Sequence, residues 1–351
     1  MKTFTRDYRI TADYPSWFSS YFEGMKPCIL DIEATGLDPS RCKVCLIALL
    51  VGTDSGIRIT QFLAENHYEE NRVLDAAMAF IERENIGYLI TFNGQAYDVP
   101  FINRRLEWNF SESHLDLFDF DLFRYLRKGT DLKSRIGSMS QKSIEEHYGI
   151  FSDRKDTISG RESVRLFDEY SLTGNSTIEK IILTHNREDV LQLCRLMHLS
   201  LDEPEDPDAA IALHGFPSAD GRFVIRPALS RPGKVLRITG EQLRHPVSAS
   251  YFPDDTSPLT AVFNASSSSF EIDLPVERAD DDCYVDLQAL GVDMTGDPDC
   301  VNGFLILNAG TVNRLSKELV SIMSKKIGLN VRERAFCGNM ILGKYCNSDR
   351  K

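Results

Sequence analysis

The amino-acid sequence predicts a mixed α/β domain over residues 1–201, in which helices flank a mixed sheet, and a smaller β-rich domain over residues 210–351. Three observations support this division. Strand-like runs follow one another closely near the start, strand and helix patterns then alternate, and only short runs punctuated by Gly, Pro and Ser follow the acidic, proline-containing stretch at 201–210. Antiparallel strands followed by β-α-β units are typical of a mixed sheet covered by helices.

Three strands are expected after an aromatic-rich lead-in. Apolar and β-branched residues dominate the segments 27–36, 43–53 and 56–64, as is typical of buried strands. The turn-forming sequence GTDSG at 52–56 joins the last two segments. The three strands are therefore predicted to form an antiparallel meander.

Helical patterns alternate with a strand pattern further along the chain. In residues 69–85 apolar side chains recur at helical spacing, which predicts an amphipathic helix, and the apolar run at 86–93 predicts the next strand. Three later segments also indicate helices, namely 97–108, 143–150 and 176–201. The last of them is long and apolar on one side, so we expect it to cover a face of the sheet.

The second domain is predicted to consist mainly of short strands. Alternating runs occur at 221–229, 233–240, 269–277 and 283–292. A terminal helix is expected over 311–327, where one face carries the apolar residues Val312, Leu315, Leu319, Ile322 and Met323. This face is expected to pack in the core of the domain.

The overall charge is negative, with 40 Lys and Arg against 52 Asp and Glu and a net charge of −12. This balance argues against a protein that coats long polyanions through bulk charge, but not against an enzyme that acts on nucleic acid. Basic residues cluster locally at 104–105 and 124–135. These segments either follow a phosphate backbone or form a solvated helix face.

Composition indicates a cytoplasmic protein without a membrane partner. The longest apolar run, residues 45–51, is far shorter than the roughly 20 residues that a transmembrane helix needs, and the first 27 residues contain no continuous apolar stretch. The eight cysteines are scattered. A lone C-x-x-C at Cys42 and Cys45 favours reduced thiols over a zinc site.

The segment LDIEATG at 30–36 places two acids inside an otherwise apolar strand. Side chains at i and i+2 point to the same side of a strand, so Asp31 and Glu33 stand together. Two buried anions repel each other, and each unpaired charge costs several kcal/mol. A bridging cation removes both penalties, and oxygen ligands favour Mg²⁺ or Mn²⁺. The alternative is a strand end at which both acids reach solvent or an arginine.

Two further acids occur where such a site needs them. Asp98 follows a predicted strand and the turn Asn93-Gly94, at the edge of the sheet where α/β proteins commonly place their chemistry. Asp189 lies on the long helix, with His185 one turn earlier on the same face. Taken singly, Asp98 is explained as a helix N-terminal acid and His185 as a structural histidine. Together they indicate one shared site.

These segments resemble a known family. LDIEATGLD at 30–38, FNGQAYDVPF at 92–101 and HNREDVLQL at 185–193 are similar to the three exonuclease motifs of the DEDD superfamily, and most similar to its YprB-like branch of predicted ribonuclease H-like nucleases. The resemblance covers about residues 25–200 and implies a ribonuclease H-like fold. Nothing comparable is recognisable after residue 203.

The resemblance implies a two-metal site for phosphodiester hydrolysis. Two Mg²⁺ or Mn²⁺ ions would be bound by four acids: Asp31, which bridges both ions, Glu33, Asp98 and Asp189. His185 is the expected general base. Three residues separate it from Asp189, whereas the DEDDh pattern has four after its histidine and the DEDDy pattern has three after a tyrosine. Substrate contacts are expected from the Thr35 and Gly36 amides, Asn93 and Arg154.

The predicted activity is that of a metal-dependent 3′–5′ exonuclease acting on single-stranded nucleic acid or duplex ends, either DNA or RNA. Two alternatives stay open: a non-catalytic nucleic-acid-binding or scaffolding protein that keeps the fold, and a structure-selective endonuclease. Arg154 either approaches a phosphate or makes a surface ion pair. The alternating acids Asp116, Asp119 and Asp121 are expected at a solvated strand edge, with an approach of Asp121 to the site as the alternative.

Overall fold

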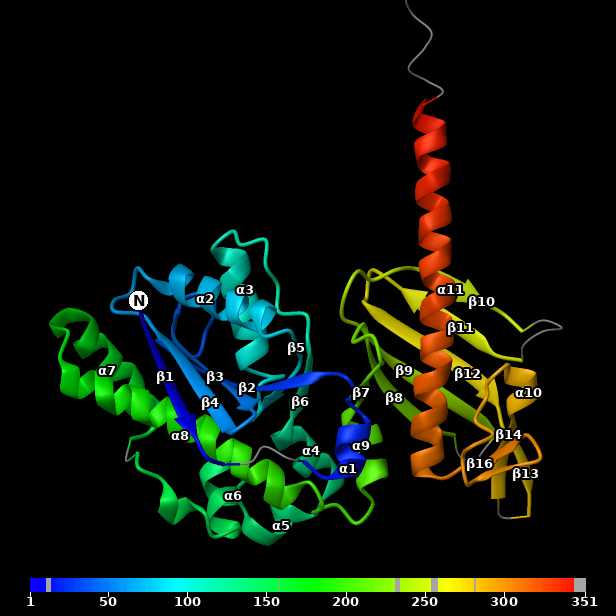
Figure 1. The fold of residues 1–351 in the computed structure, drawn as a ribbon, viewed down its shortest axis with the longest axis horizontal. Helices are drawn as coiled ribbons and strands as arrows, with labels where there is room; N and C mark the ends of the chain where they lie inside the picture. Colours follow the sequence, from blue (N-terminus) through cyan, green and yellow to red (C-terminus); the bar gives the residue numbers. More distant parts are fainter. Residues whose placement is uncertain (11–13, 157, 231–233, 254–257, 281, 344–351) are drawn as a thin grey trace, which may run out of the picture. The chain divides into compact units, whose positions relative to one another are not determined.

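The chain forms two compact units, Met1–His214 and Gly215–Lys351 (Figure 1). The computed structural model describes residues 1–10, 14–156, 158–230, 234–253, 258–280 and 282–343. The acidic, proline-containing stretch at 201–210 leads into helix α9, Pro207–His214, which belongs to the first unit. Helix α9 packs closely on α4, Leu122–Gly129, where a Cβ at Gly129 would lie 2.7 Å from the Cβ of Ala210.

The first unit is built on a six-stranded mixed sheet with the order β1-β4-β3-β2-β5-β6. β2 pairs antiparallel with β3 and parallel with β5, and β5 pairs parallel with β6. The strands are β1 (Lys2–Tyr8), β2 (Lys26–Ala34), β3 (Val44–Thr53), β4 (Gly56–Leu63), β5 (Ile86–Thr91) and β6 (Phe118–Asp121). The predicted meander and the mixed sheet are thereby confirmed.

Strand β1 lies in the segment that the sequence analysis treated only as a lead-in. It pairs antiparallel with β4, from Lys2 opposite Leu63 to Tyr8 opposite Ile57. β1 is an edge strand whose side chains are exposed or only half-buried. Such a strand lacks the clear apolar alternation by which strands are recognised in a sequence.

Helices cover both faces of this sheet. In Figure 1, α2 (Glu70–Arg83) and α3 (Asp98–Trp108) lie on one side and α8 (Ser176–Ser200) lies on the other. The remaining helices of the unit are α1 (Ser16–Ser20), α5 (Leu132–Ile136), α6 (Gln141–His147), the short 3₁₀ helix η1 (Phe151–Asp153) and α7 (Gly160–Thr173). Among the described residues, no helix is both long and apolar enough to cross a membrane.

Strand β2 sends its alternate side chains into different surroundings. Leu30 and Ile32 are buried in a core that also contains Leu74 of α2 and Phe101 of α3. Asp31, on the other side of the strand, accepts a hydrogen bond from Asn186 of α8. The two-residue period of the strand therefore separates the apolar core from the acids.

The second unit is β-rich, as predicted. One sheet has the order β10-β11-β12-β9-β8-β7 and a smaller one the order β13-β14-β16-β15. The strands are β7 (Phe216–Pro217), β8 (Phe223–Leu229), β9 (Val235–Gln242), β10 (Ala249–Tyr251), β11 (Thr260–Asn264), β12 (Ser269–Pro275), β13 (Glu277–Ala279), β14 (Asp282–Asp286), β15 (Cys300–Val301) and β16 (Phe304–Ile306). A short helix, α10, spans Leu287–Leu290.

The terminal helix α11, Ala309–Gly343, is longer than the 311–327 predicted. Its N-terminal half buries Leu315, Leu319 and Met323 and contacts β8. The apolar face inferred from the sequence therefore packs in the core of this unit.

A buried ion pair joins three elements of the first unit and provides a test of the fold. Glu70 of α2 accepts hydrogen bonds from the Val44 amide of β3 at 2.8 Å and from Arg105 Nε and Nη2 of α3 at 2.8 and 2.7 Å. Both side chains are only 4% exposed. Arg105→Ala leaves Glu70 as an unpaired buried anion, so we expect the free energy of unfolding to fall by about 3–5 kcal/mol in urea titrations.

Arg104→Ala is the matched control, because Arg104 pairs with Glu107 on the exposed side of the same helix. Its loss is expected to change the free energy of unfolding by less than about 1 kcal/mol. Equal effects of the two substitutions would contradict the assigned role of the buried pair.

Candidate active site

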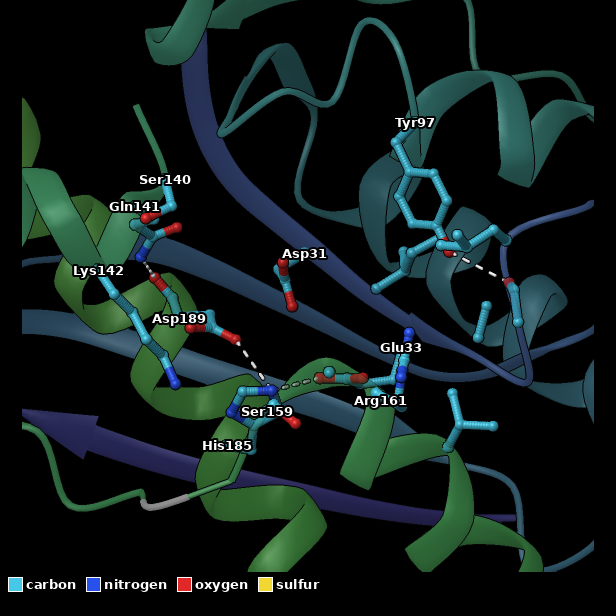
Figure 2. Close-up of a pocket in the computed structure, with 16 residues that line it drawn as sticks. Asp31, Glu33, Tyr97, Ser140, Gln141, Lys142, Ser159, Arg161, His185 and Asp189 are labelled. Carbon is cyan, nitrogen blue, oxygen red and sulfur yellow. Dashed lines mark hydrogen bonds and ion pairs between the residues drawn. The ribbon is translucent and has the colours of Figure 1, made fainter. Parts of the chain in front are cut away.

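A cavity of about 800 Å³ lies next to the carboxyl-terminal part of β2. Its lining comes from β2, the segment after it, Tyr97, the N-terminal ends of α6 and α7, and α8. Figure 2 shows Asp31, Glu33 and Asp189 directed into this space, with His185 between the last two. Asp31 and Asp189, which are 158 positions apart in the chain, therefore line one cavity.

Asp31 is held by a chain of side-chain amides. Its Oδ2 accepts a hydrogen bond of 2.8 Å from Asn186 Nδ2. The Asn186 Oδ1 in turn accepts one of 2.8 Å from Gln61 Nε2 of β4, which also donates to the Leu183 carbonyl at 3.0 Å. Asn186 and Gln61 are buried. This network fastens α8 to the sheet and fixes the orientation of Asp31.

His185 is oriented by Asp156, a residue that the sequence analysis did not select. The distance from His185 Nδ1 to Asp156 Oδ2 is 2.7 Å. An ionised carboxylate can only accept, so this geometry assigns the hydrogen to Nδ1. The other ring nitrogen, Nε2, lies 3.6 Å from Glu33 Oε1 and 3.7 Å from Asp189 Oδ2. Asp156 therefore directs Nε2 toward the acids.

Arg154 is buried and contacts three carboxylates, which corrects the expectation of a surface ion pair. Its side chain is 2% exposed. It donates to Asp156 Oδ1 at 2.6 Å, to Glu145 Oε1 at 2.8 Å and to Asp189 Oδ1 at 2.5 Å. With the guanidinium shared among three carboxylates, the geometry favours positioning of Asp189 over the expected contact with a substrate phosphate.

Asp98 lies close to the other acids but is not among the residues that line the cavity. Its Oδ1 accepts a hydrogen bond of 3.1 Å from the Ile32 amide, between Asp31 and Glu33. Its charge contributes to the raised pKa of Asp31. The structure therefore brings Asp31, Glu33, His185 and Asp189 together around the cavity and places Asp98 beside β2.

Burial is the largest influence on the charge of the acids. It raises the pKa of Asp31 well above the usual range, and the charges of Asp189, Asp98 and Glu33 add to this effect. Burial also raises the pKa of Glu33 to about 7, against the opposing charge of His185. The pKa of Asp98 rises to about 7 through burial, although backbone hydrogen bonds oppose it. Without a cation, ionisation of this cluster is unfavourable.

For His185 and Asp156, in contrast to the acids above, the surroundings favour the charged form of each side chain. Burial acts to lower the pKa of His185, but the hydrogen bond to Asp156 and the charges of Asp189 and Glu33 outweigh it and raise that pKa. Burial acts to raise the pKa of Asp156, but hydrogen bonds from His185 and Arg154 lower it below its usual range. Asp156 therefore stays ionised at neutral pH.

The expected substrate contact of the Thr35 amide needs correction, and Asn93 lies away from the acidic cavity. The Thr35 amide donates to the Lys43 carbonyl at 2.9 Å and its Oγ1 accepts from the Lys43 amide at 2.9 Å, so this amide is engaged within the protein. Asn93 lines a second cavity rather than the first, and its amide donates to Asp121 Oδ1 at 2.8 Å. Gly36 does line the first cavity, where a Cβ would lie 2.6 Å from Cys42 Sγ.

Asp119 and Asp121 are buried, so the predicted solvated strand edge is wrong for both. Asp119 accepts a hydrogen bond of 2.8 Å from Thr91 Oγ1. Asp121 caps α4 by accepting from the Arg124 amide at 3.3 Å. The alternation of acids with apolar residues does not reveal that both acids accept hydrogen bonds from donors within the protein.

The donor set fits a divalent cation. Within the described residues, Glu33, His185 and Asp189 each offer one ligand atom, and these atoms lie within 4.8 Å of one another. Asp31 adds a further carboxylate to the same cavity. Carboxylate oxygens suit Mg²⁺ and Mn²⁺, and a bound cation would relieve the repulsion that helps to raise the pKa values of Asp31 and Glu33.

The comparison with protein-family models agrees with this fold. Residues 28–200 match the model of the RNase_H superfamily, in agreement with the mixed sheet flanked by helices in this part of the chain. A comparison with curated proteins gave no match. Among solved structures, the family B DNA polymerase from the hyperthermophilic archaeon Pyrobaculum calidifontis is similar at 16% identity with a TM-score of 0.40. That similarity covers 67% of this chain and 33% of the polymerase chain, so the chain spans about a third of the polymerase.

The raised pKa values predict an unusual dependence of stability on pH. Between about pH 4.5 and 7, Glu33 and Asp98 keep protons in the folded chain that they lose in the unfolded chain. Stability therefore falls as pH rises. The raised pKa of His185 acts in the same direction, because its contribution is lost as pH rises through the folded-state pKa. We expect the free energy of unfolding without divalent cations to fall by several kcal/mol from pH 5 to 8.

Urea titrations across this pH range provide the measurement. Glu33→Gln should flatten the decrease, whereas Glu82→Gln, on the exposed face of α2, should leave it unchanged. Stability that is constant or increases from pH 5 to 8 would argue against the buried, uncompensated acids.

Proposed function

We propose that the chain is a nuclease that depends on Mg²⁺ or Mn²⁺ and removes nucleotides in the 3′–5′ direction from single strands or duplex ends. The observation that carries this proposal is the convergence of Asp31, Glu33 and Asp189 with His185 on one cavity. A second support is the RNase H-like fold of residues 28–200. The motif resemblance favours the YprB-like branch of the DEDD superfamily, and a cytoplasmic location is part of the same proposal.

The acids have distinct roles in this proposal. Asp31, Glu33, Asp98 and Asp189 would hold two divalent cations. When bound, the cations would activate a water molecule and neutralise charge on the phosphate and on the leaving oxygen. Asp31 lies close enough to Asp98 and Asp189 for their charges to raise its pKa, so a cation near Asp31 would offset the repulsion among all three carboxylates. The Ile32 amide binds Oδ1 of Asp98, so Asp98 would offer its other carboxylate oxygen to a cation.

His185 supplies the proton acceptor. Its Nδ1 hydrogen is committed to Asp156, so Nε2 is free to accept a proton from the attacking water. Asp156 then stabilises the imidazolium that forms, as in other histidine and carboxylate pairs. Arg154 holds Asp189 through Oδ1 and leaves Oδ2 nearer His185. Arg154 and Asp156 are therefore positioning residues in this proposal.

The substrate is expected to be a short end rather than a long duplex. The net charge of −12 gives little bulk attraction for a polyanion. Specific contacts next to the cavity must then retain the strand. An endonuclease and a non-catalytic scaffold are the competing proposals, and the experiments below separate them.

Digestion of end-labelled DNA and RNA tests the activity directly. Asp31→Asn should reduce hydrolysis in Mn²⁺ or Mg²⁺ by roughly 10³-fold, because losing a metal-binding carboxylate removes several kcal/mol of transition-state stabilisation. Asp54→Asn, in the exposed turn between β3 and β4, is the matched control and should retain full activity. Equal rates for the native and Asp31→Asn proteins would overturn the assignment.

Circular single strands distinguish the two modes of cleavage. An enzyme that requires an end leaves them intact, whereas a structure-selective endonuclease opens them. No hydrolysis of any linear or circular DNA or RNA would leave the scaffold as the better account.

Removing the partner of His185 should slow the reaction without unfolding the site. Asp156→Asn is expected to lower the rate by about 10–100-fold, since the ring loses its orienting acceptor. The ¹⁵N chemical shifts of His185 should show a loss of the Nδ1-protonated tautomer, a change that a purely structural role would not produce. Asp153→Asn, an exposed position in the same segment that pairs with Arg195, is the control. An unchanged tautomer together with an unchanged rate would exclude the proposed role of Asp156.

A further inference from the structure

A second cavity of about 600 Å³ adjoins the acidic one, because Ser140 and Gln141 line both. We propose that it binds the nucleotides of a single strand that neighbour the scissile phosphate. This inference rests on the proposed nuclease function. The residues that carry it are Phe92, Phe123, Arg127 and Lys133, none of which belongs to the predicted catalytic set.

Two aromatic rings form an apolar part of this cavity. Phe92 follows β5 and Phe123 lies in the first turn of α4. Their ring centroids are 5.8 Å apart at an interplanar angle of 62°. Both side chains are only half-buried, so their surfaces are accessible. Aromatic rings in such positions stack with nucleobases irrespective of sequence.

Two exposed cations line the same cavity. The Arg127 guanidinium lies 5.6 Å from the centroid of the Phe123 ring. Lys133 is exposed and donates to the Gly137 carbonyl at 2.9 Å. None of the described residues that line this cavity is acidic, in contrast to the first cavity. Cations next to aromatic faces are complementary to a phosphate backbone that carries bases.

The walls of the second cavity are joined by one buried carboxylate. Asp121 accepts from the amides of Asn93 at 2.8 Å and Gln95 at 3.4 Å, on the wall that carries Phe92. It also accepts from the Arg124 amide at 3.3 Å, at the start of the helix that carries Phe123 and Arg127. Asn93 is held at a φ of 67°, in the left-handed region. The site is therefore ordered before a ligand arrives.

The shared wall determines which ligand fits. A strand whose phosphate lies among Asp31, Glu33 and Asp189 reaches Ser140 and Gln141 and continues into the second cavity. The basic segment 124–135, left open by the sequence analysis between a phosphate-binding and a solvated role, supplies Arg127 and Lys133 to it. Acids thus surround the reacting phosphate, and cations and rings hold its neighbours.

Fluorescence anisotropy of labelled oligonucleotides tests the inference. The full chain with Asp31→Asn, which is expected to slow hydrolysis by roughly 10³-fold, is titrated into eight-nucleotide single-stranded DNA or RNA. Adding Phe123→Leu should weaken binding about tenfold, as expected for loss of a stacked base. Adding Arg127→Gln should reduce the slope of log affinity against log salt by roughly 0.7, the value for one phosphate contact.

Arg83→Gln is the matched control, because Arg83 also lies over a phenylalanine ring, that of Phe80 on α2, at 5.1 Å and lines neither cavity. An abasic oligonucleotide should bind the Phe123→Leu protein as well as its parent, since no base is stacked. If Phe123→Leu fails to fold, as judged by thermal melting, the salt slope of Arg127→Gln decides. Both variants behaving like the Arg83→Gln control, or no binding of any oligonucleotide, would overturn the inference.

The proposed nuclease activity and the proposed strand-binding role of the second cavity can be disproved separately. If the native chain hydrolyses nucleic acid but both variants bind it unchanged, the second cavity does not bind the strand, and the proposed nuclease activity stands. Binding that depends on Phe123 and Arg127, without hydrolysis in Mg²⁺ or Mn²⁺, supports the strand-binding cavity and removes the proposed activity.

Discussion

Burial of several like charges around one cavity is the constraint on which this molecule depends. Asp31 and Glu33 come from β2 and Asp189 comes from α8, with Asp98 beside them. Arg154 and His185 compensate part of this charge, but Arg154 also pairs with Asp156 and Glu145. The excess negative charge is relieved either by protonation or by a bound cation. The charge repulsion that destabilises the cluster without a cation therefore makes it suitable for binding a divalent metal ion.

Elements far apart in the chain set the positions of these acids. Gln61 on β4 and Asn186 on α8 fix Asp31, and the segment that contains Arg154 and Asp156 fixes Asp189 and His185. Each contact is short and largely shielded from water, so the donor atoms are positioned by the fold rather than by the ligand. Such preorganisation is the contribution that a protein can make to metal-assisted hydrolysis.

Much of the first domain could be predicted because its signals are local. Runs of apolar and β-branched residues predicted β2, β3 and β4, and helical spacing predicted α2 and α8. Edge strand β1 was not predicted, because an exposed strand lacks a two-residue apolar period. The convergence of Asp31 and Glu33 on one side of β2 follows from the period of a strand.

The surroundings of the site were harder to predict, because they depend on partners distant in sequence. Arg154 looked equally suited to a phosphate or to solvent, and only the fold shows it buried among three carboxylates. Asp121 looked solvated because its partners are backbone amides of another loop. Asp156 carried no local signal other than its proximity to Arg154 in the sequence. Its partner His185 lies 29 positions away.

Calorimetric titration of the native chain with Mn²⁺ at pH 7.5, repeated in buffers of different ionisation enthalpy, tests the central claim most directly. The account predicts saturable binding accompanied by release of protons, because carboxyls with raised pKa values must ionise to coordinate the metal. Absence of binding, or binding without any proton release, would contradict the view that the buried acids form a divalent-cation site.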